Sequence, residues 1–206
     1  MEHGETSQPS GLMTLVIGLG NPGETYRGTR HNIGFLVLDE LARRESIPID
    51  KKKYTSRYGK GVIHNTPVVL IKPETYMNLS GEAVGRFLRF YKAERSDIIV
   101  VHDDLDFPFG TVRIRRGGGD GGHKGVHSVI VHSGGSDFLR VRMGIGKPER
   151  KEMTEYYVLK HFSGTEARAL PEIIDRACDA VVTLLCEGAD AAMARFNSKT
   201  DNGQHQ

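Results

Sequence analysis

Apolar and polar positions alternate along the chain with two different periods, which predict strands and helices in turn. A period of two, or an unbroken apolar run of about four to eight residues, predicts a strand. The predicted strands are residues 14–19, 97–101, 111–116 and 138–145, with a hairpin of residues 54–64 and 67–72 around Asn65-Thr66. The run Lys51-Lys52-Lys53 interrupts this pattern and is interpreted as a solvated charge run.

Apolar residues spaced three and four apart predict helices between these strands. Two of the predicted helices are residues 31–45 and residues 124–132. Another is capped by Ser80 and carries Val84, Phe87, Leu88 and Tyr91 on one face. The last is a long helix with Pro171 in its first turn and Gly188 at its end. Strands that alternate with helices are typical of one sheet covered by helices on both faces. The pattern therefore predicts an α/β fold.

The length of 206 residues, without a long linker or an internal repeat, indicates a single domain. Its predicted extent is residues 12–197, flanked by polar tails at 1–11 and 198–206 that we expect to be flexible. No apolar run in the sequence approaches the roughly 20 residues of a membrane span, and we expect no membrane partner. Cys178 and Cys186 are too far apart on a helix for a disulfide, and are interpreted as small buried side chains of a cytoplasmic protein.

Charge is distributed unevenly along the chain. Residues 1–112 hold 14 basic and 14 acidic side chains, whereas residues 113–151 hold 9 basic and 3 acidic ones. Residues 152–206 hold 5 basic and 9 acidic ones. The basic block consists of Arg113, Arg115, Arg116, Lys124, Arg140, Arg142, Lys147, Arg150 and Lys151. Such a block suits a phosphate-bearing partner, and solvated strand faces are the alternative interpretation.

The segment Gly18-Leu19-Gly20-Asn21-Pro22-Gly23 matches the G-x-G-x-x-G pattern of dinucleotide-binding folds. In those folds the loop opens directly into a helix, so that the helix N-terminus meets the pyrophosphate. Here the proline and glycines keep the backbone irregular, and the helical pattern starts only near His31. The surroundings therefore disfavour a nucleotide site, and the loop instead presents a polar amide, a phenol and an imidazole: Asn21, Tyr26 and His31.

Polar segments follow four of the predicted strands, at residues 21–31, 74–78, 102–106 and 117–124. In open α/β sheets the loops beyond the strand ends form the ligand crevice. A carboxylate such as Asp103 could hold the imidazole of His31 so that its other nitrogen takes a proton from water. A metal site is an alternative, although the spacing of the candidate ligands His102, Asp103, Asp104 and Asp106 matches no specific ligand set.

Six separated motifs, in the same order along the chain, resemble bacterial-type peptidyl-tRNA hydrolases. They are Gly18–Gly23 with Tyr26, Thr29-Arg30-His31-Asn32, residues 72–81 (KPETYMNLSG), His102-Asp103-Asp104-Leu105-Asp106, Gly117–Gly125, and residues 142–148 (RMGIGKP). The resemblance runs from about residue 12 to residue 197. It implies a single-domain, monomeric α/β/α sandwich with a central mixed, mainly parallel twisted sheet. It also implies an esterase that cleaves peptide from the 3′ ribose of tRNA without a cofactor or metal.

The resemblance further implies roles for individual residues. His31 would be the general base that activates water, Asp103 would orient it, and Asn21 would contact the peptide end of the substrate. Residues that would bind the substrate around the tRNA 3′ end are Tyr26, Tyr76, Met77, Asn78, His123 and Lys124. The basic block would then hold tRNA phosphates.

Two positions depart from the family's usual pattern. Lys124 stands where asparagine is common, which puts its role as a substrate ligand in question, and Tyr76 stands where phenylalanine is common. Two alternative functions remain: a catalytically idle RNA-binding relative of the same fold, and a nucleotide-dependent dehydrogenase. The joint presence of Asn21, His31, Asn78 and Asp103 favours the hydrolase.

Overall fold

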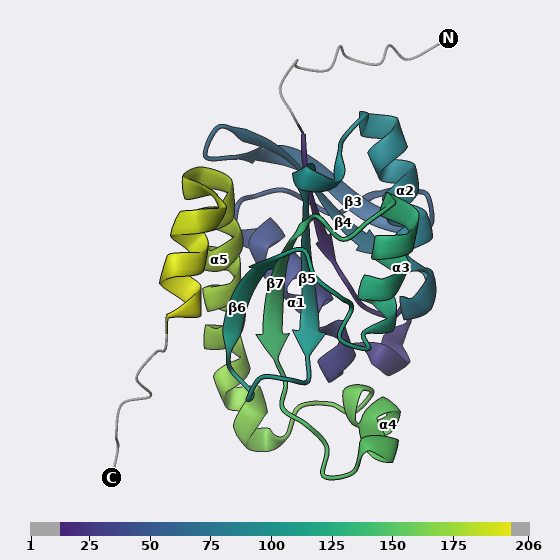
Figure 1. The fold of residues 1–206 in the computed structure, drawn as a ribbon, viewed down its shortest axis with the longest axis vertical. Helices are drawn as coiled ribbons and strands as arrows, with labels where there is room; N and C mark the ends of the chain where they lie inside the picture. Colours follow the sequence, from purple (N-terminus) through teal and green to yellow (C-terminus); the bar gives the residue numbers. More distant parts are fainter. Residues whose placement is uncertain (1–12, 199–206) are drawn as a thin grey trace.

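The computed structural model describes residues 13–198, which form one seven-stranded sheet between two layers of helices (Figure 1). The strands are β1 (Thr14–Gly18), β2 (Lys51–Lys53), β3 (Ser56–Ile63), β4 (Thr66–Pro73), β5 (Ile98–Asp104), β6 (Val112–Arg116) and β7 (Leu139–Gly144). The α-helices are α1 (Ile33–Arg44), α2 (Ser80–Tyr91), α3 (Lys124–Ser133), α4 (Thr154–Val158) and α5 (Gly164–Asn197). Two short 3₁₀ turns, η2 (Arg30–Asn32) and η3 (Met77–Leu79), lead into α1 and α2.

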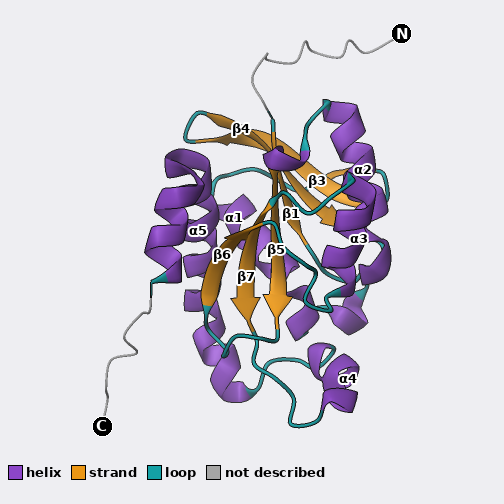
Figure 2. Cartoon of the chain, viewed as in Figure 1, coloured by secondary structure: helices purple, strands orange, loops and turns teal. Residues whose placement is uncertain are grey.

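The strand order is β2-β3-β4-β1-β5-β7-β6. The four central strands β4, β1, β5 and β7 are parallel, whereas β2, β3 and β6 are antiparallel to their neighbours. The predicted α/β/α sandwich with a mixed, mainly parallel sheet is therefore confirmed. The parallel strands end at the same edge, so β1, β4 and β5 deliver the segments that follow them to one place (Figure 2).

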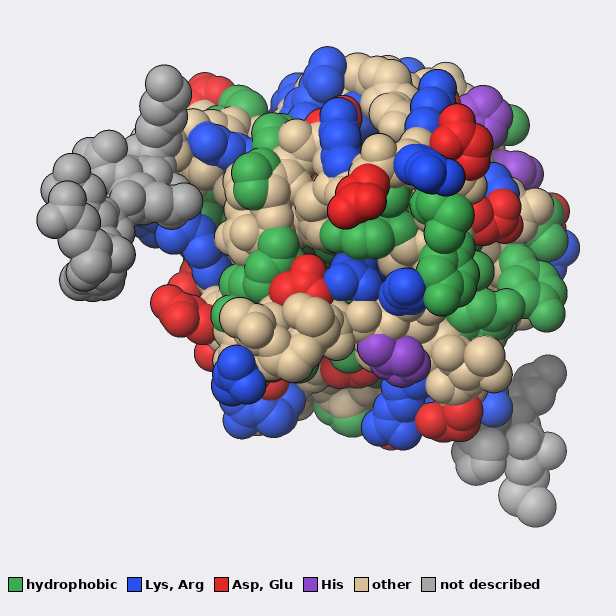
Figure 3. All heavy atoms as spheres, turned by 90° about the horizontal axis from the view of Figure 1, so that it is seen from below, with side chains coloured by type: hydrophobic (Ala, Val, Ile, Leu, Met, Phe, Trp, Pro, Cys, Tyr) green, Lys and Arg blue, Asp and Glu red, His purple; other side chains and the backbone are tan. Residues whose placement is uncertain are grey.

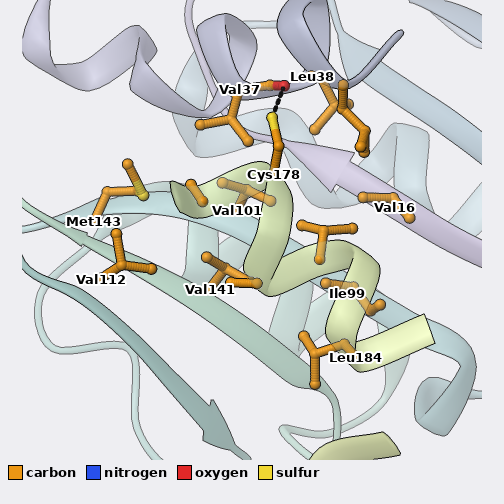
Figure 4. Packing of buried hydrophobic residues seen from close by; sticks show 14 of the residues in the cluster. Val16, Val37, Leu38, Ile99, Val101, Val112, Val141, Met143, Cys178 and Leu184 are labelled. Atoms are coloured by element: carbon orange, nitrogen blue, oxygen red, sulfur yellow. Dashed lines mark hydrogen bonds between the residues drawn. The ribbon is translucent and has the colours of Figure 1, made fainter. Parts of the chain in front are cut away.

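The core has two halves because successive residues of a strand point to opposite faces of the sheet. Val16 and Ile99 pack under α1 and α5, whereas Ile17 and Val100 pack under α2 and α3. Figure 4 shows the first half, in which side chains of β1, β5, β6 and β7 pack with those of α1 and α5. Cys178 lies within it, and its thiol donates to the Val37 carbonyl at 3.5 Å. Burial raises the pKa of this thiol to about 12, so Cys178 behaves as a small apolar side chain.

Several predicted helix boundaries are wrong, each for a local reason. Residues 31–32 form a 3₁₀ turn, and α1 begins at Ile33. Ser80 does not cap α2, because it is the first helical residue and its hydroxyl is buried. The first turn is served instead by Ser128 of α3, whose hydroxyl accepts the Gly81 N–H at 2.9 Å.

The long helix α5 begins seven residues before Pro171, where Ser163 and Glu166 form a reciprocal capping box. Pro171 therefore lies inside the helix. Gly188 ends the first helical stretch as predicted, because its positive φ of 84° is not helical. A second stretch, which was not predicted, follows this kink within α5 and continues to Asn197.

Some strand boundaries also differ from the prediction, because pairing with a neighbouring strand determines where the strand begins and ends. The strand predicted at residues 97–101 extends to Asp104, because His102 and Asp103 pair with β7. Lys51–Lys53 is solvated but forms an edge strand against β3. The hairpin turns at His64 and Asn65, one residue earlier than predicted, and both have positive φ.

Cys186 is exposed, contrary to its predicted burial, whereas Cys178 is buried as predicted. No helix among residues 13–198 is long and apolar enough to cross a membrane. The predicted tails at residues 1–11 and 198–206 lie outside the described residues except for Ser198, and the domain boundaries stay a prediction.

Candidate active site

A cleft of about 940 Å³ opens at the carboxyl ends of β1, β4 and β5, with α4 on its far side. All nine residues that the sequence analysis assigned to catalysis or substrate binding line it: Asn21, Tyr26, His31, Tyr76, Met77, Asn78, Asp103, His123 and Lys124. Figure 3 looks at the molecule from the end toward which β5 and β7 point, and shows basic and acidic side chains interspersed over this face.

His31 and Asp103 form the centre of the cleft. Nδ1 of His31 lies 2.9 Å and 3.0 Å from the two carboxylate oxygens of Asp103. Asp103 is almost fully buried, and the His31 side chain is 12 % exposed. Since an ionised carboxylate only accepts hydrogen bonds, Nδ1 of His31 carries the proton and Nε2 keeps a lone pair.

Close packing of α1 against the sheet brings these two residues together. Gly34 lies one helical turn beyond His31, and a Cβ at this position would lie 2.5 Å from the carbonyl oxygen of Val101 and from the backbone nitrogen of Leu19. Only a residue without a side chain allows this approach. His31 from the turn before α1 therefore reaches Asp103 near the end of β5.

His123 is a second imidazole on the same carboxylate. Its Nε2 lies 2.9 Å from Asp103 Oδ1, and its Nδ1 accepts the backbone N–H groups of Gly125 and Val126 as the N-cap of α3. Because Nδ1 accepts these bonds, the proton of His123 lies on Nε2 and is donated to Asp103. Asp103 thus accepts hydrogen bonds from two imidazoles.

The charges in this cluster determine its protonation. Burial disfavours the imidazolium of His31, but the Asp103 charge and hydrogen bond outweigh it, so the pKa of His31 is raised above the ordinary histidine value. Burial likewise opposes ionisation of Asp103, yet interactions with His31 and then His123 hold the pKa of this carboxyl far below its usual range. Asp103 is therefore a permanent carboxylate, and His31 is a base strengthened by it.

His31, Asp103 and His123 also form the one group of potential metal ligands found among residues 13–198. A metal ligand must present a lone pair, whereas the His123 nitrogen that faces Asp103 keeps its proton while its other nitrogen caps α3. The donor set therefore fits a hydrogen-bonded network better than a metal centre. Two other candidate ligands form ion pairs instead: Asp104 pairs with Arg142 at 2.6 Å, and Asp106 pairs with Lys147 at 2.9 Å.

Asn21 also lines the cleft, and hydrogen bonds hold both its side chain and its backbone. Its side-chain oxygen accepts the Met77 N–H at 2.8 Å, and its backbone N–H and carbonyl both bond to the side chain of Asn32 at 2.9 Å. This bond directs the side-chain oxygen toward Met77, and the two N–H donors of the Asn21 amide remain available to a ligand. Asn32 thus supports Asn21, a contact that its place in the Thr29–Asn32 motif does not reveal.

The glycine-rich segment 117–123 reaches the cleft by an unexpected route. Because β6 is antiparallel, this segment starts at the opposite edge of the sheet and runs back to place His123 beside Asp103. Arg140 holds it there, donating to the carbonyls of Gly117 and Gly119 from a position only 2 % exposed. Burial, with the charges of Arg115 and Arg142, lowers the pKa of Arg140 to about 10. Arg140 thus supports a loop, although its charge had placed it in the basic block.

His102 is a buried neighbour of the cluster. Its Nδ1 lies 2.7 Å from the Asp103 carbonyl, its Nε2 has no partner among the described residues, and its ring stands edge-on to His123. Burial lowers the pKa of His102 well below the ordinary value, so this imidazole stays neutral.

Lys124, the departure from the usual pattern, extends from the first turn of α3 across the cleft toward α4. Its Nζ lies 3.7 Å from a carboxylate oxygen of Glu155, and both side chains are largely exposed. Lys124 is therefore an accessible cation beside His31, with a weak and displaceable partner.

Comparisons with known proteins agree with this geometry. A family model for peptidyl-tRNA hydrolase matches residues 15–204. A peptidyl-tRNA hydrolase of Dehalococcoides mccartyi is 49 % identical over 189 residues, covering 90 % of this chain and all of the relative. One of Geobacter metallireducens is 45 % identical over 185 residues, covering 90 % of this chain and 95 % of the relative.

Solved structures give the same answer for the fold. The crystal structure of peptidyl-tRNA hydrolase from Acinetobacter baumannii superposes with a TM-score of 0.86 at 38 % identity, covering 92 % of this chain and 98 % of that one. A peptidyl-tRNA hydrolase complex with N-propanol superposes with a TM-score of 0.87 at 36 % identity, covering 94 % and 100 % of the two chains. This chain belongs to the peptidyl-tRNA hydrolase family.

Proposed function

We propose that the protein hydrolyses the ester between a peptide and the 3′ ribose of tRNA, with His31 as the general base. The observation that carries this mechanism is the bond from His31 Nδ1 to the buried carboxylate of Asp103, which leaves Nε2 as a proton acceptor in the cleft. Family membership supports the substrate class, and disfavours both the idle RNA-binding relative and the dehydrogenase.

In the first step, Nε2 of His31 takes a proton from water as the water oxygen attacks the ester carbonyl. The imidazolium that forms is stabilised by Asp103, which remains ionised. Negative charge develops on the former carbonyl oxygen, where the free N–H donors of Asn21 are available. The imidazolium then returns its proton to the departing ribose oxygen, which releases peptide and tRNA.

We propose that Tyr26, Tyr76 and Asn78 line the path of the tRNA 3′ end, with Met77 packed beneath them. Tyr76 is 61 % exposed and can stack on a base, whereas Met77 is buried. His123 is nearly buried, so its main contribution is to hold Asp103. Arg115, Lys124 and Lys151 are exposed along the cleft and are the cations best placed for tRNA phosphates.

We further propose that the enzyme acts as a monomer in the cytoplasm, without metal or cofactor. An activated ester requires a base and hydrogen-bond donors, both of which the cleft supplies.

The test is turnover of N-acetyl-aminoacyl-tRNA by the wild type and by His31→Asn. We expect the variant to lose about 10²- to 10⁴-fold in kcat, the usual contribution of a positioned general base. His64→Asn, an exposed substitution in the β3–β4 turn, is the matched control and keeps full activity. Near-normal turnover by folded His31→Asn would remove His31 from the mechanism, and turnover that required NAD would favour the dehydrogenase.

A further inference from the structure

Arg30, the residue before His31, is a buried cation to which the mechanism above gives no role. Its side chain is only 7 % exposed. One guanidinium nitrogen donates to the carbonyls of His161 at 2.7 Å and Lys160 at 3.4 Å, and the other lies 2.6 Å from the carboxylate of Glu166. A buried arginine with three polar partners on one distant segment has a defined orientation.

Aromatic rings enclose this guanidinium. Its carbon lies 4.5 Å from the centre of the Tyr157 ring and 5.4 Å from that of Phe162. Tyr157 is itself fixed, since its hydroxyl donates to the Ile145 carbonyl at 2.5 Å. The planar group of an arginine fills this space and stacks on a ring, which an ammonium group cannot do.

Glu166 is shared between two functions. The same carboxylate oxygen accepts the Ser163 N–H at 2.7 Å in the capping box that starts α5. Arg30 is therefore fastened to the beginning of the longest helix in the described residues, and its position is set by the core that α5 buries.

The backbone reinforces the same junction. The Arg30 N–H donates to the Lys160 carbonyl at 3.0 Å, and Thr29 forms an isolated β-bridge with His161. The 3₁₀ turn that carries His31 is thus held from two sides: by Asp103 of β5 through the imidazole, and by the 157–166 segment through Arg30.

We propose that Arg30 is a positioning residue for His31: its clamp on Lys160, His161 and Glu166 fixes the η2 turn so that the imidazole meets Asp103 and the cleft in the productive orientation. This inference rests on the proposed function of His31. In this proposal Arg30 orients His31 and does not bind a tRNA phosphate, because its side chain is buried and out of reach of the RNA.

The test is Arg30→Lys, which keeps the positive charge but removes the planar guanidinium group and its several N–H donors. We expect kcat to fall about 10- to 100-fold with KM within about twofold of the wild type, because small misplacement of a catalytic group costs this much. The titration of His31, followed by NMR of its imidazole, should move to lower pH as contact with Asp103 weakens. The other charged or titratable groups that act on His31 are His123, Lys124 and Glu155.

Arg44→Lys is the matched control. Arg44 also links the α1 region to α5, with 2.7 Å to Asp179 and 3.1 Å to the Asp175 carbonyl, but lies away from the cleft. It should keep wild-type kcat and His31 titration. Glu166→Gln is the second variant, and should lower kcat and shift the titration in the same direction by a smaller amount.

Unchanged kcat and unchanged His31 titration in folded Arg30→Lys would overturn the proposal, as would an equal loss in Arg44→Lys. If Arg30→Lys does not fold, an unchanged Glu166→Gln variant overturns it and a shifted one supports it. If the wild type fails to hydrolyse the ester, the proposed function fails, and the His31 titration still decides whether Arg30 positions the imidazole.

Discussion

Asn32 holds Asn21 by two reciprocal hydrogen bonds: its side-chain oxygen accepts the Asn21 N–H and its amide donates to the Asn21 carbonyl, both at 2.9 Å. This is the pattern of a paired strand, made here by a single side chain. Because Asn32 directly follows His31, the proposed base and Asn21 are linked through one short turn.

Replacing Asn32 by aspartate therefore tests this link. The carboxylate keeps the acceptor for the Asn21 N–H but leaves the Asn21 carbonyl without its donor, at a cost of about 1–3 kcal/mol for a buried group. We expect lower stability in urea unfolding and about a tenfold fall in kcat/KM. Asn197→Asp is the control, since Asn197 makes the same reciprocal pair with Ile114 far from the cleft. Equal losses of kcat/KM in both variants would contradict the role of Asn32 in the cleft.

Asp103→Asn should change both the rate and its pH dependence. Burial lowers the pKa of His31 and Asp103 raises it, and the net result is a raised pKa. We therefore expect the wild-type enzyme to lose activity, as pH falls, at a midpoint above the ordinary histidine pKa. Without the carboxylate, burial dominates and the midpoint should move to lower pH. The measurements are kcat/KM from pH 5 to 9 and tRNA affinity, which should stay largely intact. A loss confined to affinity would show that Asp103 serves the RNA instead.

Lys124→Asn restores the residue that is common in the family. If Lys124 contacts a phosphate, KM should rise by about two- to fivefold, the salt dependence of binding should weaken, and kcat should stay nearly unchanged. Burial and the Lys124 charge both lower the pKa of His31, so the acid limb of activity should also move to slightly higher pH. Lys92→Asn, an exposed substitution at the far end of α2, is the control.

Glu155→Gln tests the ion pair between Glu155 and Lys124 from the side of the carboxylate. It removes the competitor 3.7 Å from Lys124, so KM should fall, and this gain should vanish in a Lys124→Asn background. A large fall in kcat for Lys124→Asn at saturating substrate, with an unaltered salt dependence, would place Lys124 at the reacting ester.

Removal of metal ions should leave turnover unchanged, since His31, Asp103 and His123 satisfy one another by hydrogen bonds. The assay uses a short aminoacylated RNA hairpin that folds without Mg²⁺, before and after dialysis against a strong chelator. Activity that disappears on dialysis and returns with Zn²⁺ would show that the cluster binds a metal during catalysis.

Much of the fold was predictable because strands and helices place side chains on one face with different periods, and the apolar residues of this chain follow those periods. The strand at residues 14–19 and the helix at 124–132 follow directly from such patterns. The extension of β5 to Asp104 was not predictable in this way, because pairing with β7 keeps polar residues in a strand. The start of α5 did have a local signal, the Ser163-x-x-Glu166 capping box. Pro171, which is typical of a first helical turn, gave a second and misleading signal for the same helix start.

The residues of the candidate site could be identified from sequence motifs, whereas the residues that support them could be recognised only from their tertiary contacts. Nothing in the alternating pattern of β7 distinguishes buried Arg140 from half-buried Arg142; the glycine carbonyls that Arg140 binds lie about 20 residues earlier in the chain. The His123 bond to Asp103 likewise spans two elements. Such partners are visible only once the sheet is assembled.

The separation of His31 from Asp103 by 72 positions has a consequence for synthesis of the protein itself. A growing chain is a peptide esterified to tRNA, and so belongs to the class of molecule that the finished protein cleaves. His31 emerges from the ribosome well before the segment carrying Asp103, and β1 cannot gain its neighbour β5 until that segment follows. The imidazole has no carboxylate to strengthen it during this interval. In the proposed mechanism, this order of the elements delays esterase activity until synthesis has passed Asp103, at the midpoint of the 206-residue chain.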